Sequence, residues 1–137
     1  MSTLKFVISI FLALALGGCA TVGTIDSRDI DQGITQSFNA PYETVLAATT
    51  DTMSRLNVNV ISVEEKDAGA AIKFSKAVNA FSWGEIGRVS VLKSTGSETR
   101  VVVTSVKRSR AQITGTSEGE FAKKIFKGVS NTLVQLQ

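Results

Sequence analysis

Two segments with helical periodicity enclose a block of strand-like segments, and this order restricts the fold of the chain more than any other feature. The first helical segment follows Pro41, a residue that suits the first turn of a helix, and we expect it to end at Asn57. The second runs from about Ser117 to Leu136, and Ser117 with Glu120 has the pattern of a capping box. Each segment has one apolar face, formed in the first by Tyr42, Val45, Leu46, Thr49, Met53 and Leu56 and in the second by Phe121, Ile125, Val129, Thr132, Leu133 and Leu136.

Alternating and β-branched residues predict strands before and between these helices. A short strand at residues 34–38 precedes the first helix. The others are expected at residues 58–63, 70–75, 86–93 and 99–107, with turn signals at 64–69 and a hairpin connection at 94–98. Residues 76–84 are ambiguous and could form a loop, and residues 108–116 either continue the last strand or loop out.

The resulting order, β-α-β-β-β-β-α, predicts an α+β fold, with an antiparallel sheet of about four to five strands and both helices packed on one face. The other face of the sheet would be covered only in part, by residues 76–84 or by a partner. Gly128 weakens the second helix relative to alanine and therefore suggests close packing against a neighbour. Over residues 34–137 this element order resembles the helix-grip domains of the outer-membrane assembly lipoprotein BamC and of several small lipoprotein families.

The first twenty residues have the pattern of an export signal. Lys5 and the amino terminus form a short positive region, and the apolar run at residues 6–16 is shorter than the roughly 20 residues that a spanning helix needs. The following Leu16-Gly17-Gly18-Cys19 resembles the lipobox of bacterial lipoprotein precursors. The resemblance implies cleavage between Gly18 and Cys19 and attachment of fatty acids such as palmitate to the cysteine, whose thiolate is a strong nucleophile. The alternatives are an ordinary cleaved signal, in which Cys19 is incidental, and a signal anchor.

This interpretation divides the chain into a signal peptide at residues 1–18, an acylated Cys19 with a flexible tether at 19–33, and one α+β domain at 34–137. Residues 20–33 are small, polar and charged, and as a tether they could extend to about 45 Å. Ala20 stands directly after the cysteine, where enterobacterial sorting reads aspartate as a signal for inner-membrane retention. By that similarity we expect an outer-membrane protein whose domain faces the periplasm, with the inner membrane and surface exposure as open alternatives.

Composition excludes several classes of function. The chain has no histidine and a single cysteine, so histidine-based triads, histidine metal sites, disulfides and zinc clusters are all excluded. A formal net charge of +3, to which Lys5 contributes, is no argument for nucleic-acid binding. Asp26, Asp29 and Asp31 lack the glycine and the distal glutamate of a calcium loop. We therefore expect no metal, no other cofactor and no catalytic residues.

Two groups of residues are candidate binding sites. Lys107, Arg108 and Arg110 are either a solvated strand end or a contact to anionic headgroups or lipopolysaccharide phosphates. Phe81 and Trp83 either cover the core or form an exposed anchor for a partner.

These observations predict a lipid-anchored, non-enzymatic envelope lipoprotein that binds another envelope protein and serves as an assembly accessory. The alternative is a module that binds a small molecule or lipid in a groove between helix and sheet. An enzyme would be indicated by a buried acid with a shifted pKa beside a cleft, for which Glu85 is the candidate.

Overall fold

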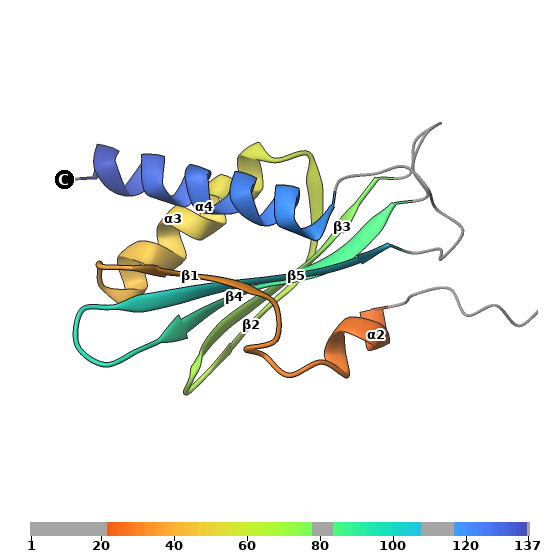
Figure 1. Cartoon of the computed structure of the whole chain (residues 1–137), viewed down its shortest axis with the longest axis horizontal. Coiled ribbons are helices and arrows are strands. Elements are labelled where there is room, and N and C mark those ends of the chain that lie inside the picture. Colours follow the sequence, from red (N-terminus) through yellow and green to blue (C-terminus); the bar gives the residue numbers. More distant parts are fainter. Residues whose placement is uncertain (1–21, 78–83, 108–116, 137) are drawn as a thin grey trace, which may run out of the picture.

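A computed structural model describes residues 22–77, 84–107 and 117–136, and its elements follow the predicted order (Figure 1). One short helix that the sequence did not predict, α2 (Val22–Asp26), comes first. The other elements are β1 (Ile34–Phe38), α3 (Tyr42–Arg55), β2 (Val58–Lys66), β3 (Gly69–Lys76), β4 (Glu85–Lys93), β5 (Thr99–Lys107) and α4 (Glu118–Gln135). The predicted α+β class is confirmed.

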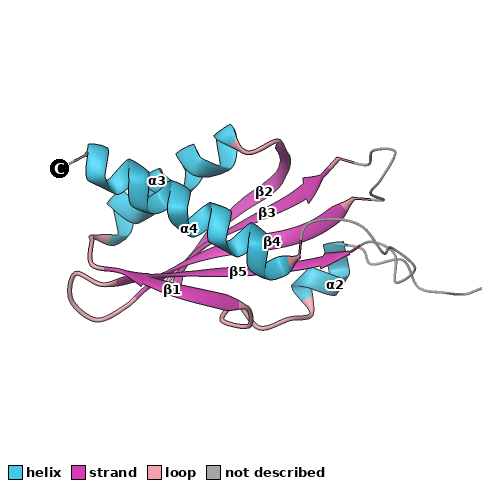
Figure 2. Cartoon of the chain, turned by 45° about the horizontal axis from the view of Figure 1, so that its top comes forward, coloured by secondary structure: helices cyan, strands magenta, loops and turns pink. Residues whose placement is uncertain are grey.

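The five strands form one antiparallel sheet in the order β1-β5-β4-β3-β2. Helices α3 and α4 lie side by side on one face, which we call the inner face, and α2 lies on the opposite, outer face (Figures 1 and 2). Strands β1 and β2 form the two edges of the sheet.

Local sequence signals account for the element boundaries. Helix α4 begins at a complete capping box, because the Ser117 hydroxyl accepts from the Glu120 N–H and the Glu120 carboxylate accepts from the Ser117 N–H, each at 3.2 Å. The hairpin between β4 and β5 turns at Gly96, whose φ of 74° is in the left-handed region that glycine adopts without strain. Both features were predicted and are confirmed.

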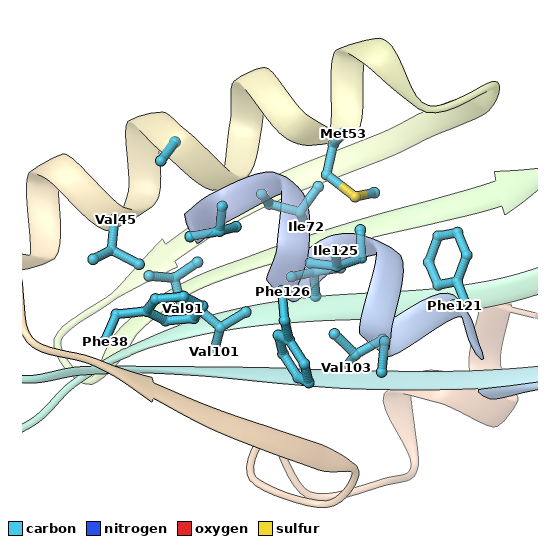
Figure 3. Packing of buried hydrophobic residues seen from close by; sticks show 14 of the residues in the cluster. Phe38, Val45, Met53, Ile72, Val91, Val101, Val103, Phe121, Ile125 and Phe126 are labelled. Carbon is cyan, nitrogen blue, oxygen red and sulfur yellow. The ribbon is translucent and has the colours of Figure 1, made fainter. Parts of the chain in front are cut away.

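The hydrophobic core lies between the inner face and the two long helices (Figure 3). It includes valines and an isoleucine of the central strands, Val45 and Met53 of α3, and several side chains of α4, among them Phe121, Ile125 and Phe126. Gly128 lies directly against Thr52 of α3, where an added Cβ would overlap the threonine methyl group. The expectation of close packing at this glycine is therefore confirmed.

Three details differ from the prediction. Strand β2 continues through Glu64 and Glu65 to Lys66, because the first residues of β3 pair with it, so the turn is confined to the residues just after Lys66. Leu136 is 61% exposed, since α4 ends at Gln135 and its last turn extends beyond the core. The prediction of a flexible tether is wrong for residues 22–33, which contain α2 and pack on the outer face.

None of the helices in the described part of the chain is both long and apolar enough to cross a membrane.

Candidate functional site

Residues 22–33, which we call the strap, cross the outer face of the sheet before the chain enters β1. Helix α2 contacts β4 and β5, and the side chain of Ile25 is fully buried. At the end of the strap, Gly33 has a φ of 149°, and an added Cβ would collide with the carbonyl oxygen of Val103. The strap is thus a packed part of the domain.

One row of paired residues across three strands holds the strap. Lys73 of β3 is paired with Arg88 of β4, and Arg88 is paired with Thr104 of β5. The Lys73 Nζ contacts a carboxylate oxygen of Asp26 at 2.6 Å, and the Thr104 hydroxyl donates to the carbonyl oxygen of Gln32. Side chains at both ends of the row therefore bind the strap.

The central member of this row, Arg88, makes the most contacts with the strap. Its Nη1 donates to the carbonyl oxygen of Ile25 at 3.2 Å, and its Nη2 donates to the carbonyl oxygens of Arg28 and Asp29 at 3.1 and 2.5 Å. These carbonyls lie in the last turn of α2 and just after it, and those of Ile25 and Asp29 also accept from main-chain N–H groups of the strap. The arginine side chain is only 5% exposed, so the bonds are shielded from competing water.

The charges around Arg88 and Lys73 also favour a strap that is packed on the sheet. Burial lowers the pKa of Arg88, and the neighbouring carboxylates of Asp26 and Asp29 oppose that shift. Hydrogen bonds from Lys73 to Asp26 and Glu64 raise the pKa of the lysine, and the bond from Lys73 lowers the pKa of Glu64. Lys73 is therefore a charged bridge between the strap and β2.

A half-open pocket of about 400 Å³ lies where the strap meets β2 and β3. Its lining carries both charges, from Asp26, Arg28, Glu64, Lys66, Lys73 and Arg88. The groove expected from the sequence was between a helix and the sheet, whereas this pocket is on the outer face and is polar. It has the chemistry to bind a small charged molecule, not an apolar one.

The free edge of β2 is a second candidate surface. This strand ends the sheet, and its outer side is paired with no other strand of the described part. Three large apolar residues of β2 are exposed, Val60 and Ile61 at 43% and Val63 at 53%. Between Val60 and Ser62 the pairing with β3 shifts register. The half of the strand before Glu64 thus combines unpaired main-chain groups with uncharged, apolar side chains.

Most of the site residues predicted from the sequence lie outside the described residues. This applies to Gly18 and Cys19, to Phe81 and Trp83, and to Arg108 and Arg110. Lys107 is the exposed last residue of β5.

Glu85 is buried at 2% exposure at the start of β4, between Lys76 of β3 and Lys107 of β5 in the pairing of the sheet. Its nearer carboxylate oxygen is 3.9 Å from the Lys76 Nζ. Neither carboxylate oxygen has a hydrogen-bond partner among the residues described.

Within the described ranges no three histidine, cysteine, aspartate or glutamate side chains gather in a way that could hold a metal ion. No family model and no curated protein matches this chain.

Residues that the sequence analysis did not select are central to the outer face. Arg88 and Lys73 each occupy an outward position on a strand, where a charged residue ordinarily faces water. Ile25 is one of three apolar residues, with Val22 and Ile30, in a segment whose other residues are polar, charged or glycine. The available signals were an isoleucine in a largely polar segment and an arginine among the apolar residues of the strand predicted at 86–93, and both are weak.

Proposed function

We propose that this protein is a lipid-anchored lipoprotein of the bacterial envelope, held by acyl chains on Cys19, which acts without catalysis as an interaction module for another envelope protein. The sequence Leu16-Gly17-Gly18-Cys19 supports the anchor. The exposed apolar edge of β2 supports the interaction and is the observation that carries it.

An unpaired strand edge is normally protected by charge, proline or a covering segment, since it otherwise recruits other strands. In β2 the charges are concentrated at Glu64, Glu65 and Lys66, and residues 58–63 carry none. An extended segment of a partner can add to this half of the edge through main-chain hydrogen bonds. Val60 and Val63 would then give the contact its side-chain specificity.

The anchor is tested by labelling growing cells with radioactive palmitate. The wild-type chain should carry label and stay in the membrane fraction, and Cys19→Ser should lose both. An unlabelled wild-type chain would refute the anchor.

The interaction is tested by crosslinking the acylated protein in cells and identifying partners by mass spectrometry. Val63→Lys should reduce capture of a specific partner at least tenfold, because a charge on the edge opposes strand addition. Val134→Lys is the matched control, since Val134 is 73% exposed on α4, away from the edge. Equal capture by both variants would contradict the proposal for β2. In the same experiment, Trp83→Ala tests the other candidate binding site, Phe81 and Trp83, which was predicted from the sequence.

The pocket beside the strap favours a second candidate function, binding of a small charged molecule. Native mass spectrometry of the protein incubated with envelope extract should show a bound species that Lys73→Met weakens. Detection of unliganded protein alone would count against it.

A further inference from the structure

We infer that the strap seats the domain directly on the lipid headgroups, with the end of the sheet at Lys76 and Lys107 facing the bilayer. This inference rests on the proposed acylation of Cys19. It concerns a different property, the height and orientation of the domain above the membrane.

The packed strap shortens the tether. Had residues 20–33 been flexible, they could have extended to about 45 Å. In the structure α2 begins at Val22, three residues after Cys19. Three residues span at most about 10 Å. The domain must therefore remain within about one headgroup layer of the anchored cysteine for as long as the strap stays in place.

Contacts along its whole length hold the strap. Ile25 buries its side chain, and Arg88 and Lys73 bind its main chain and Asp26. Near β1, the carbonyl oxygen of Gln32 accepts from Thr104. Burial of the isoleucine side chain stabilises the packed strap, and hydrogen bonds from a charged group add to that stability. Detachment of the strap must disrupt all of these contacts together.

The direction of α2 decides which end of the domain meets the bilayer. Strands β3 and β5 finish, and β4 starts, at one end of the sheet. Helix α2 begins near that end, whereas the carboxyl terminus of α4 lies at the opposite end (Figures 1 and 2). Lys76 and Lys107 are the last residues of β3 and β5. Anionic headgroups attract lysines at the end of a domain that faces them, and these two lysines outnumber the single acid between them, Glu85. Charge and tether length thus favour the same orientation.

The test uses the mature chain from Cys19 onward, coupled through this single cysteine to a maleimide lipid in a supported bilayer. Because the attachment is chemical, the result does not depend on acylation in cells. Neutron reflectometry then measures the hydrated gap between headgroups and protein on a bilayer of phosphatidylcholine and on one containing phosphatidylglycerol. The wild-type gap should be below about 10 Å on both bilayers.

Two variants should widen the gap. Insertion of twelve glycine and serine residues between Cys19 and Val22 leaves the fold intact and should raise the gap to about 20 Å. Arg88→Gln combined with Lys73→Gln should release the strap and widen the gap similarly, with circular dichroism confirming that the sheet remains folded. Arg100→Gln, at an exposed position on β5, is the control and should leave the gap unchanged.

Three results would overturn the inference. One is a wild-type gap as wide as that of the insertion variant, which would mean that the tether is flexible. Another is a narrow gap on the phosphatidylglycerol bilayer alone, which would mean that charge and not the strap holds the domain down. The third is a folded Arg88→Gln, Lys73→Gln variant with an unchanged gap. Absence of palmitate labelling in cells would refute the proposed anchor and would leave this measurement unaffected.

Discussion

Arg88 and Ile25, which are 63 positions apart in the chain, meet on the outer face of the sheet, where the arginine Nη1 donates to the isoleucine carbonyl oxygen at 3.2 Å. The arginine is buried in β4, and its guanidinium donates to main-chain carbonyls in the last turn of a five-residue helix and just after it. A helix this short is unstable by itself in water. Its presence therefore depends on this contact and on the burial of Ile25.

Replacement of Arg88 by glutamine should detach the strap while the rest of the domain stays folded. Loss of hydrogen bonds from a charged donor to carbonyl oxygens costs about 1.5–3 kcal/mol, and local opening increases accordingly. Trypsin cleavage after Arg28, followed by mass spectrometry, should become at least tenfold faster than in the wild type. The same cleavage in Arg100→Gln should keep the wild-type rate, and an unchanged rate in Arg88→Gln would show that Arg88 does not hold the strap.

Alanine at Gly128 should destabilise the domain, although alanine is the better helix former by about 1 kcal/mol. The new methyl group would overlap Cγ2 of Thr52, and overpacking of this kind typically costs about 1–3 kcal/mol. Urea denaturation should detect the loss. Thr52→Ala removes the clashing atoms, so the double variant should recover most of the stability. Additive effects of the two substitutions would contradict direct contact.

The ion pair between Lys73 and Glu64 should make stability depend on pH at both extremes. The folded pKa of Glu64 is lowered below 4.5, so its contribution is complete above that value and is lost as the pH falls through the folded pKa. Bonds to Asp26 and, second, to Glu64 raise the folded pKa of Lys73 above 10.5, so its contribution is complete below that value and is lost as the pH rises through the folded pKa.

Unfolding free energies of the wild type and Glu64→Gln should therefore differ most between about pH 6 and 9 and converge in acid. In a Lys73→Met background, the Glu64→Gln substitution should have little effect at any pH. A difference that persists unchanged below pH 3 would argue against the pair.

The capping box of α4 should contribute measurably to stability. Ser117→Ala removes the hydroxyl that accepts from the Glu120 N–H, and a change of this kind typically costs about 1 kcal/mol. Thermal unfolding is a suitable measurement. The same substitution at Ser130, inside α4, should change stability by less than about 0.5 kcal/mol. Equal effects at the two positions would mean that the cap contributes nothing beyond the loss of a hydroxyl.

Local patterns were sufficient to predict the inner half of the fold. Val45 and Met53 recur at helical spacing, and Ile72 and Phe74 alternate along a strand, because each helix and strand must turn one apolar side toward the core. The outer face could not be predicted in this way. Arg88 bonds to main-chain carbonyls, and a carbonyl oxygen is the same in every residue, so the strap carries no side-chain pattern that identifies its partner.

The amino-acid sequence alone determined the order of the long helices and strands, their inward faces, the capping box and the close approach at Gly128. These features depend on neighbours within a few residues or on one-sided burial, both of which appear as local periodicity. Only the tertiary structure decided that residues 22–33 pack on the sheet, that β2 is an edge with exposed valines, and that Lys73, Arg88 and Thr104 form one row. Those relationships are set by which strands pair and in which register, and pairing brings together residues that no local pattern connects.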